Sequence, residues 1–364
     1  TNFAKLGMTS EAKELMSIFF GQTALKKNRY GKPEKPVQTM AVLGAKDGER
    51  LWQRAIGDDD GVLFVADTAV LADRTANRLL GLDLTDGTTR WTQEDVKTDS
   101  GTSTAVVAVT TPADLSGPAA VSGQAFAPDP DDDTRIVQVG ADKSFRVLDA
   151  ATGRITAPLR QGSAGPEDEK IAHDGRFVVV EANGTSQRLV SYDLAKPGEP
   201  DLLYSAPAGS RMTELTPCGP DRVCWVETAS YDPGTTRVKS VNAAEGGGVW
   251  DRGLPDVDSL VPVGDHLLAG QGTPKPRVSL LDAGGAQVWN VEGRAARLDG
   301  GNLLRFNTAL STTPEDPALF GEHLGDEAEP LGALSNVRSQ TCSWNTAVIA
   351  CVADENFMIQ RFAG

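Results

Sequence analysis

Alternating apolar and polar residues, interrupted by glycine-containing turns, run along most of the chain. One pattern recurs: an apolar strand, a turn that ends in glycine and, four residues after that glycine, a position that usually holds a large side chain. Clear copies are LLGLDLTDGTTRW and VKSVNAAEGGGVW. The residues at this position are Trp52, Trp91, Ala157, Leu202, Trp250 and Trp289. Alternation with a glycine turn predicts two antiparallel strands in each copy.

The spacing of these copies predicts the fold. They follow each other at about 40 to 48 residues, and turn–strand segments such as HDGRFVVVEANGTSQR supply two further strands in each interval. Periods of this length with four short strands are typical of β-propeller blades. The one longer interval, between Trp91 and Ala157, contains Pro112–Thr134, which is rich in proline, glycine and aspartate. This composition predicts an inserted loop.

We therefore predict an all-β domain, a β-propeller of four-stranded blades, over residues 39–364. Six clear copies and a degenerate seventh after Trp289 favour seven blades. Eight blades also fit, because both chain ends supply what looks like the third strand of a blade. The last sheet has three strands, over SNVRSQTCSWN, TAVIACVAD and NFMIQRFAG. We expect the N-terminal side to supply its fourth strand and close the ring.

Residues 1–38 differ from the repeats. The apolar residues Leu15, Ile18 and Phe19 have helical spacing, and Ser10 is a suitable N-cap, so this segment predicts a short N-terminal helical arm. The basic, proline-containing segment RYGKPEKP then forms a linker to the propeller. Two roles fit the arm: it packs on the propeller rim, or it belongs to a membrane-anchoring or partner-binding segment.

The net charge of the chain limits the kinds of partner that it is expected to bind. Lys and Arg number 35 and Asp and Glu number 50, which gives a formal net charge of −15. An acidic surface repels phosphate backbones and anionic lipid, so we expect no nucleic-acid partner. No apolar stretch is long enough to span a bilayer. Since the chain starts at Thr1 rather than Met, we expect that a leader or anchor has been removed and that membrane association depends on that anchor or on a partner.

Four cysteines fall in two close pairs. Cys218 and Cys224 flank the turn CGPDRVC, and Cys342 and Cys351 flank CSWNTAVIAC. Each pair fits a short hairpin, in which antiparallel partners lie close enough for a disulfide. An even number of cysteines in local pairs favours two disulfides and an oxidising, extracytoplasmic compartment. The alternative is four reduced, buried thiols in a cytosolic protein.

No residue set predicts a catalytic, cofactor or metal site. His173, His266 and His323 occupy turns or strand starts in different repeats, which suits rim residues. The run Asp129–Asp133 has the alternating oxygen spacing of a calcium loop but lacks the downstream glycine and glutamate. Nucleophile-elbow, phosphate-loop and zinc-protease motifs are absent from the sequence. We therefore expect neither a catalytic residue nor a bound cofactor.

The repeat strand-[LV]-D-x-x-[TD]-G-x-x-x-W resembles that of pyrroloquinoline-quinone-type propellers. That superfamily includes quinoprotein dehydrogenases and non-enzymatic members, among them the propeller lipoprotein of the outer-membrane assembly machine and extracellular domains of actinobacterial proteins. The Ala-, Gly-, Asp- and Thr-rich composition, with paired cysteines in hairpins, is most similar to an actinobacterial cell-envelope member. The quinoprotein enzymes use a disulfide between adjacent cysteines, and this chain has no Cys-Cys pair. Their active-site residues therefore match no position here.

The resemblance implies a non-enzymatic binding or scaffolding propeller in the cell envelope, secreted, lipid-anchored or membrane-anchored. Its partner would be another envelope or membrane protein. In this interpretation Trp52, Trp91, Trp250 and Trp289 dock neighbouring blades. Two other functions fit the same sequence. One is a quinoprotein-type oxidoreductase or another enzyme with its site in the central channel. The other is the extracellular sensor domain of a membrane-anchored receptor.

Overall fold

The computed structural model shows an all-β protein. The described residues are 6–8, 16–23, 37–44, 49–57, 60–94, 104–112, 115, 134–230, 232–272, 275–344, 346, 348–353 and 357–361. They form 31 β-strands. Among these residues, no helix is long and apolar enough to cross a bilayer.

The strands follow one another in chain order. The first sixteen are β1 (Leu6–Met8), β2 (Met16–Thr23), β3 (Val37–Gly44), β4 (Arg50–Ile56), β5 (Gly61–Val65), β6 (Thr68–Asp73), β7 (Arg78–Asp83), β8 (Thr89–Glu94), β9 (Ala105–Thr110), β10 (Arg135–Val139), β11 (Ser144–Asp149), β12 (Ile155–Gln161), β13 (Lys170–His173), β14 (Arg176–Asn183), β15 (Ser186–Asp193) and β16 (Asp201–Ser205). The rest are β17 (Ser210–Pro217), β18 (Arg222–Ala229), β19 (Asp232–Asn242), β20 (Gly248–Pro255), β21 (Val257–Val263), β22 (His266–Gln271), β23 (Arg277–Leu281), β24 (Gln287–Glu292), β25 (Arg294–Arg297), β26 (Asn302–Phe306), β27 (Ala318–His323), β28 (Glu329–Ala333), β29 (Val337–Trp344), β30 (Val348–Ala353) and β31 (Phe357–Arg361).

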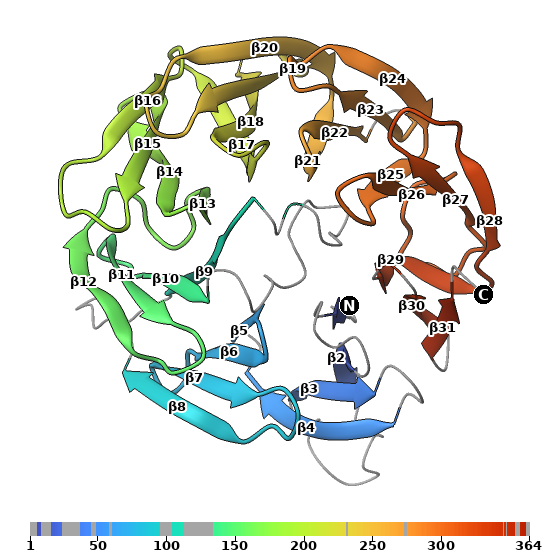
Figure 1. Cartoon of the computed structure of the whole chain (residues 1–364), viewed down its shortest axis with the longest axis horizontal. Coiled ribbons are helices and arrows are strands. Elements are labelled where there is room, and N and C mark those ends of the chain that lie inside the picture. Colours follow the sequence, from blue (N-terminus) through green and yellow to red (C-terminus); the bar gives the residue numbers. More distant parts are fainter. Residues whose placement is uncertain are drawn as a thin grey trace, which may run out of the picture.

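These strands form eight blades around a central axis (Figure 1). Blades 1 to 8 contain β1–β4, β5–β8, β9–β12, β13–β16, β17–β20, β21–β24, β25–β28 and β29–β31. Neighbouring strands within a blade are antiparallel, and β9 and β13 pair in parallel, which joins blades 3 and 4 into one sheet. The described part of the chain therefore has eight blades, the alternative count, rather than the favoured seven.

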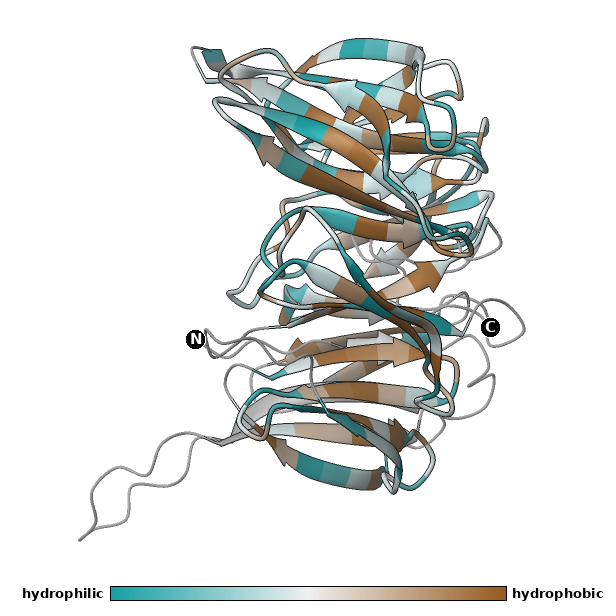
Figure 2. Cartoon of the chain, turned by 90° about the vertical axis from the view of Figure 1, so that its left-hand side faces the viewer, coloured by the Kyte–Doolittle hydropathy of each residue, from teal (hydrophilic) through white to brown (hydrophobic). Residues whose placement is uncertain are grey.

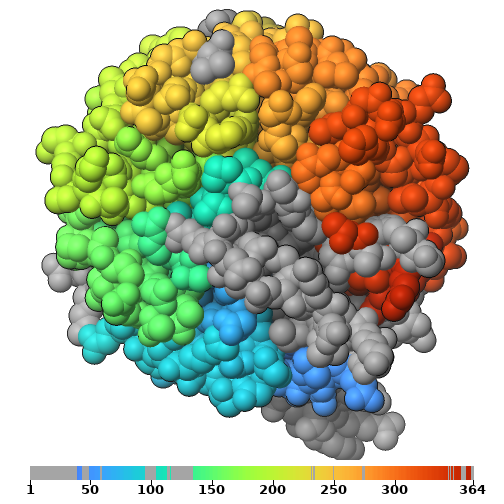
Figure 3. Space-filling view, in the orientation of Figure 1, coloured from blue at the N-terminus to red at the C-terminus, as the bar shows by residue number. Residues whose placement is uncertain are grey.

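The hydrophobic core lies between the blades. The buried apolar residues form seven clusters, and each cluster spans one junction between consecutive blades, from blades 1–2 to blades 7–8. Seen from the side, hydrophobic residues follow the strands and hydrophilic residues gather at the turns (Figure 2). Successive blades pack side by side around the ring in the space-filling view (Figure 3). Because blades 2 to 7 bury both faces, their strands are apolar on two sides.

A β-bulge precedes the recurring position after the glycine turn. In blade 2, Gly81 pairs with Trp91 and Leu82 pairs with Thr89, so that Arg90 is the extra residue. The pairings of β4, β12, β20 and β24 leave one extra residue at the equivalent place. A bulge increases the local twist and redirects the side chain that follows it. The repeat therefore turns this residue toward the next blade.

The predicted N-terminal helix is wrong where the structure describes it. Met16–Thr23 is the strand β2, which pairs with β3 over eight residues, from Met16 opposite Gly44 to Thr23 opposite Val37. The run MSIFFGQT also suits a buried strand, since it is rich in apolar and aromatic residues. The segment is a strand rather than a helix because it pairs with β3, and a local sequence pattern does not reveal such pairing.

The expected closing strand is also absent from its predicted place. Strands β1 and β2 belong to blade 1, together with β3 and β4, and not to the last sheet. Blade 8 therefore has three strands, and among the described residues none pairs with the outer edge of β31. The innermost strands β1 and β29 are in contact, which closes the ring near its axis.

Candidate functional site: the hairpin face

One face of the propeller carries two turns from each of blades 2 to 7. One turn connects the first and second strands and the other connects the third and fourth. Backbone hydrogen bonds hold the two turns together: Leu84 N donates to Asp67 O at 3.0 Å in blade 2, and Leu194 N donates to Gly175 O at 2.9 Å in blade 4. Blades 3, 5 and 7 have the same bond. We call this surface the hairpin face.

Trp91 shows how the recurring position joins two blades. It lies on β8 of blade 2, is 8% exposed, and its Nε1–H donates to the backbone oxygen of Ala150 in blade 3 at 2.7 Å. Its ring lies against Gly153, where a Cβ atom would come within 2.5 Å of the indole. Gly153 has a φ of 69°, which favours glycine. Both the turn conformation and the space available therefore require glycine at this place.

The same arrangement recurs at two other junctions. Trp52 donates to Leu84 O at 2.8 Å and lies against Gly87. The Nε1–H of Trp250 donates to Ala283 O at 3.1 Å, and its ring lies against Gly285. The indole, the accepting carbonyl and the glycine thus form one repeated joint between blades.

Trp289 departs from this joint. Its buried Nε1 atom has no hydrogen-bond partner among the described residues, and a Cβ on Gly325 of the next blade would touch nothing within 4 Å. The guanidinium of Arg305 lies 5.5 Å from the centre of its ring instead. Trp52, Trp250 and Trp289 are only half-buried. Trp289 lacks the joint because the repeat that follows it is weak, and the turn between the third and fourth strands of blade 7 does not place a glycine against the indole.

The position after the turn is displaced in blade 4. Leu202 is 55% exposed, whereas Leu203 is 7% exposed and packs against blade 5, with Gly246 next to its backbone. The assignment of Leu202 to the recurring position is therefore wrong by one residue. The pairing of β15 with β16 gives the reason. Leu189 pairs with Tyr204 and Val190 pairs with Leu202, so Leu203 itself is the extra residue of the bulge.

Two tryptophans that the repeat did not mark are the most buried. Trp225 on β18 and Trp344 on β29 are each 1% exposed, and they lie inside the clusters of junctions 4–5 and 7–8. Neither lies four residues after the glycine of a turn, so the turn-based pattern does not find them. Their positions in apolar strand segments are the only sequence signal of burial.

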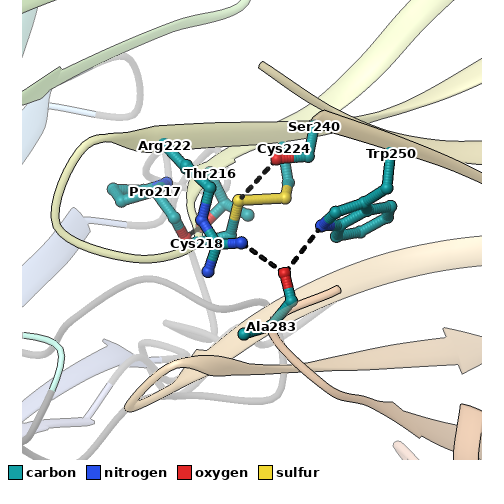
Figure 4. Close-up of a disulfide and its surroundings, with 8 residues drawn as sticks. All are labelled: Thr216, Pro217, Cys218, Arg222, Cys224, Ser240, Trp250 and Ala283. Atoms are coloured by element: carbon teal, nitrogen blue, oxygen red, sulfur yellow. Dashed lines mark hydrogen bonds between the residues drawn. A yellow bond between two sulfur atoms is a disulfide. The ribbon is translucent and has the colours of Figure 1, made fainter. Parts of the chain in front are cut away.

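Both predicted disulfides are present. Cys218 and Cys224 close the turn between the first and second strands of blade 5, and the Sγ of Cys218 lies 3.8 Å from Ser240 Oγ (Figure 4). Arg222, inside this closed turn, donates to Ala283 O, the carbonyl that also accepts from Trp250. The disulfide therefore fixes the turn that carries a second donor to the joint between blades 5 and 6.

The second disulfide lies at another junction. Cys342 on β29 and Cys351 on β30 belong to the buried cluster between blades 7 and 8. The pairing of these two strands is irregular between Arg338 and Ser343. The covalent bond thus connects two strands across an irregular stretch of their ladder.

The three histidines lie on the hairpin face in three blades. His173 is 3% exposed, its Nδ1 lies 2.9 Å from Thr110 Oγ1, and its Nε2 has no partner among the described residues. Burial lowers the pKa of His173 to about 4. His266 contacts Asp265 at 2.6 Å, and His323 contacts Asn302 at 3.1 Å. Each histidine thus has a local partner in its own turn or in the neighbouring blade.

Acidic side chains are exposed at turns of successive blades on this face. Asp174 in blade 4, Asp221 in blade 5, Asp265 in blade 6 and Asp326 in blade 7 are all exposed. The insertion of blade 3 also begins and ends here, since Ala150 N donates to Thr134 O at 2.8 Å. This side of the disk therefore gives a fixed row of negative charges beside the insertion.

Among the described residues, no group of three or more His, Cys, Asp or Glu side chains is placed to hold a metal ion. Asp60 accepts hydrogen bonds from Gly57 N at 2.7 Å and Arg74 N at 2.9 Å, which fixes a loop. The run Asp129–Asp133 lies outside the described residues, as does most of Pro112–Thr134.

Several solved structures of other proteins share the fold of this chain. The chain is similar to the computationally designed Ika8 protein, with 14% identity over 98% of this chain and 95% of that chain and a TM-score of 0.58. It is similar to AztD from Citrobacter koseri, with 11% identity over 96% and 92% and a TM-score of 0.55. The dihydro-heme d1 dehydrogenase NirN matches at 11% over 97% and 71%, with a TM-score of 0.56. At these identities the likeness shows the fold alone.

A family comparison adds the type of repeat. The model of the family described as outer membrane protein assembly factor BamB matches residues 35–124, which include the whole Trp52 joint and Trp91 itself. The chain is a β-propeller of PQQ-like repeats.

Proposed function

We propose that this protein is a non-enzymatic binding or scaffolding propeller of the cell envelope, and that its hairpin face holds a protein partner. The observation that carries the proposal is the row of exposed acidic turns in blades 4 to 7. A row of exposed acidic residues spread over four blades suits a macromolecular partner better than a small molecule.

The framework under these turns supports a binding role. Indole joints, paired turns and a disulfide hold the turns in place at several junctions. A surface that is already ordered loses little conformational entropy when a partner binds. The insertion Pro112–Thr134 is a further candidate contact, because long inserted loops often persist for a functional reason.

The disulfides support a location for the protein, and its net charge supports a type of partner. Disulfides form and persist in oxidising compartments, which supports an extracytoplasmic site in the envelope. Attachment to the membrane would come from an anchor or from the partner. The net charge of −15 favours a basic patch on the partner, and such association weakens as salt rises. The partner we propose is another envelope or membrane protein.

Charge reversal on the hairpin face tests this proposal. The double variant Asp221→Lys/Asp326→Lys changes two exposed turns, and Glu167→Lys/Asp232→Lys is the matched control on loops of the opposite face. Proteins captured from an envelope extract by each immobilised variant would be identified by cross-linking and quantified. We expect the first variant to lose at least nine tenths of the partner and the control to retain it. Equal capture by both variants would contradict the hairpin face as the binding surface.

Two further experiments separate the parts of the proposal. Deletion of residues 116–133 should weaken capture if the insertion contributes, and an unchanged partner set would remove the insertion from the interface.

A dye-linked dehydrogenase assay after addition of quinone and calcium tests the non-enzymatic assignment directly. Turnover in that assay would overturn it.

A further inference from the structure

Blade 8 has an open outer edge among the described residues. Each of the other blades ends in a fourth strand, whereas blade 8 ends in its third strand, β31. The outer edge of such a strand presents backbone N–H and C=O groups that can pair with another extended segment. The same groups are paired in the third strands of blades 1 to 7.

An exposed apolar side chain marks the same edge. The exposed large apolar residues of the described chain are Leu51, Ile155, Leu159, Leu202, Val288 and Ile359. All except Ile359 lie on fourth strands. Ile359 lies on the third strand of blade 8 and is 41% exposed, whereas Leu319 on the third strand of blade 7 is 1% exposed. Leu319 is covered in the cluster that blades 7 and 8 form together, whereas Ile359 has no such cover among the described residues.

The direction of Ile359 shows what would cover it. Met358 packs into the cluster between blades 7 and 8, and Gln360 lies near Gly332 on β28 of blade 7. Because alternate residues of a strand point to opposite faces, Ile359 and Arg361 face away from blade 7 and toward blade 1. In blades 1, 2 and 5 the indole on the fourth strand also points toward the following blade.

Among the described residues, the junction between blades 8 and 1 differs from the other seven. Seven apolar clusters cover the other seven junctions, and none of the clusters formed by described residues spans blades 8 and 1. The innermost strands β1 and β29 are in contact, so the junction is made near the axis. The outer part of the junction is where a fourth strand of blade 8 would lie.

We propose that blade 8 binds an extended segment of a partner polypeptide as its fourth strand. The fourth strands of the other blades are five to eight residues long, which sets the length of the segment. A large apolar side chain of the segment packs beside Ile359, and an acidic side chain pairs with the exposed Arg361 on the same face. The bound segment would lie between blades 8 and 1, where it would pack in the way that the fourth strands of other blades pack against the blade that follows. This interface uses none of the acidic turns and stands independently of the proposed function.

Peptide binding to the full chain tests this site. The probe is a synthetic peptide with the sequence of Gly285–Glu292, GAQVWNVE, which carries the tryptophan of β24, the fourth strand of blade 6. Binding of the labelled peptide is followed by fluorescence anisotropy. The variant Ile359→Lys places a charge at the edge, and Leu202→Lys is the matched control, an exposed apolar residue on a complete blade.

We expect saturable binding to the native protein, at least tenfold weaker binding to Ile359→Lys, and unchanged binding to Leu202→Lys. A peptide with serine in place of tryptophan should also bind at least tenfold more weakly. No saturable binding at millimolar peptide, or equal binding to both protein variants, would overturn the proposal.

Hydrogen exchange checks the state of the edge without a peptide. About half of the amides of Phe357–Arg361 should exchange rapidly in the free protein, because an edge strand is bonded on one side only. The peptide should slow them. Full protection in the dilute free protein would show that the chain itself already occupies the edge. Protection that rises with protein concentration would identify a second copy as the occupant. Either result would overturn a partner strand as the occupant.

Discussion

Replacing each indole with phenylalanine separates the hydrogen bond of the interblade joint from its apolar area. Trp91→Phe keeps an aromatic ring but removes the N–H that donates to Ala150 O at 2.7 Å. The net loss of one hydrogen bond costs about 0.5–1.5 kcal/mol, and a buried acceptor left without a donor raises this to about 1–3 kcal/mol. Trp289→Phe removes an N–H that is buried and has no partner among the described residues.

The two variants share the change in ring size, so the hydrogen bond and the deeper burial of Trp91 together account for their difference. We expect Trp91→Phe to lower the free energy of unfolding by about 1–3 kcal/mol more than Trp289→Phe does. Equilibrium unfolding in urea, with the slope compared between variants, measures this difference. An equal loss at both positions, or a larger loss at Trp289, would refute the view that the hydrogen bond distinguishes the two joints.

Three further predictions concern the turns of the hairpin face. Gly153→Ala should destabilise the protein clearly more than Gly175→Ala in thermal unfolding, because both have positive φ values but only at Gly153 would a Cβ meet an indole ring, at 2.5 Å; equal losses would contradict this. Titration of the denatured, unreduced protein should find no free thiol, and removing Cys218–Cys224 by a double serine substitution should cost about 2–3 kcal/mol, as expected for a short closed loop. Burial lowers the pKa of His173 to about 4 from its ordinary value of 6.5, so the unfolded chain takes up the proton first, and the protein should lose up to about 3 kcal/mol as pH falls from 6.5 toward 4. Denaturant unfolding as a function of pH should show a flatter profile for His173→Gln, and an identical profile would contradict the assignment.

Local signals were sufficient for the repeat and for the covalent bonds. Glycine turns such as Gly87 and Gly153 have a positive φ, and the residue four places later is positioned by a bulge, so both features can be found in a short stretch of sequence. The cysteine pairs lie within single hairpins, where spacing in the chain is close to distance in space.

Features that depend on distant pairing were not predictable in the same way. Met16–Thr23 has a helical spacing of apolar residues, but pairing with β3 makes it a strand and adds it to blade 1. The number of blades changed for the same reason, since it depends on which sheet each terminal strand joins. The row of acidic turns was also hidden in the sequence, because residues such as Asp174 and Asp326 approach one surface only when their blades form a ring.

The parallel pairing of β9 with β13 has a mechanical consequence. Ala172 is paired with Val109, and His173 with Thr110, at the ends of the two innermost strands. Blades 3 and 4 are therefore joined into one sheet by backbone hydrogen bonds. Blades 7 and 8 share one isolated backbone bridge, between Glu315 and Val337, and the remaining junctions of the described chain rest on side-chain packing and individual hydrogen bonds. Tension applied through a partner at the insertion, which starts directly after Thr110, would load two blades in shear at once. Under load, the ring should yield first at other junctions, and this pair should separate last.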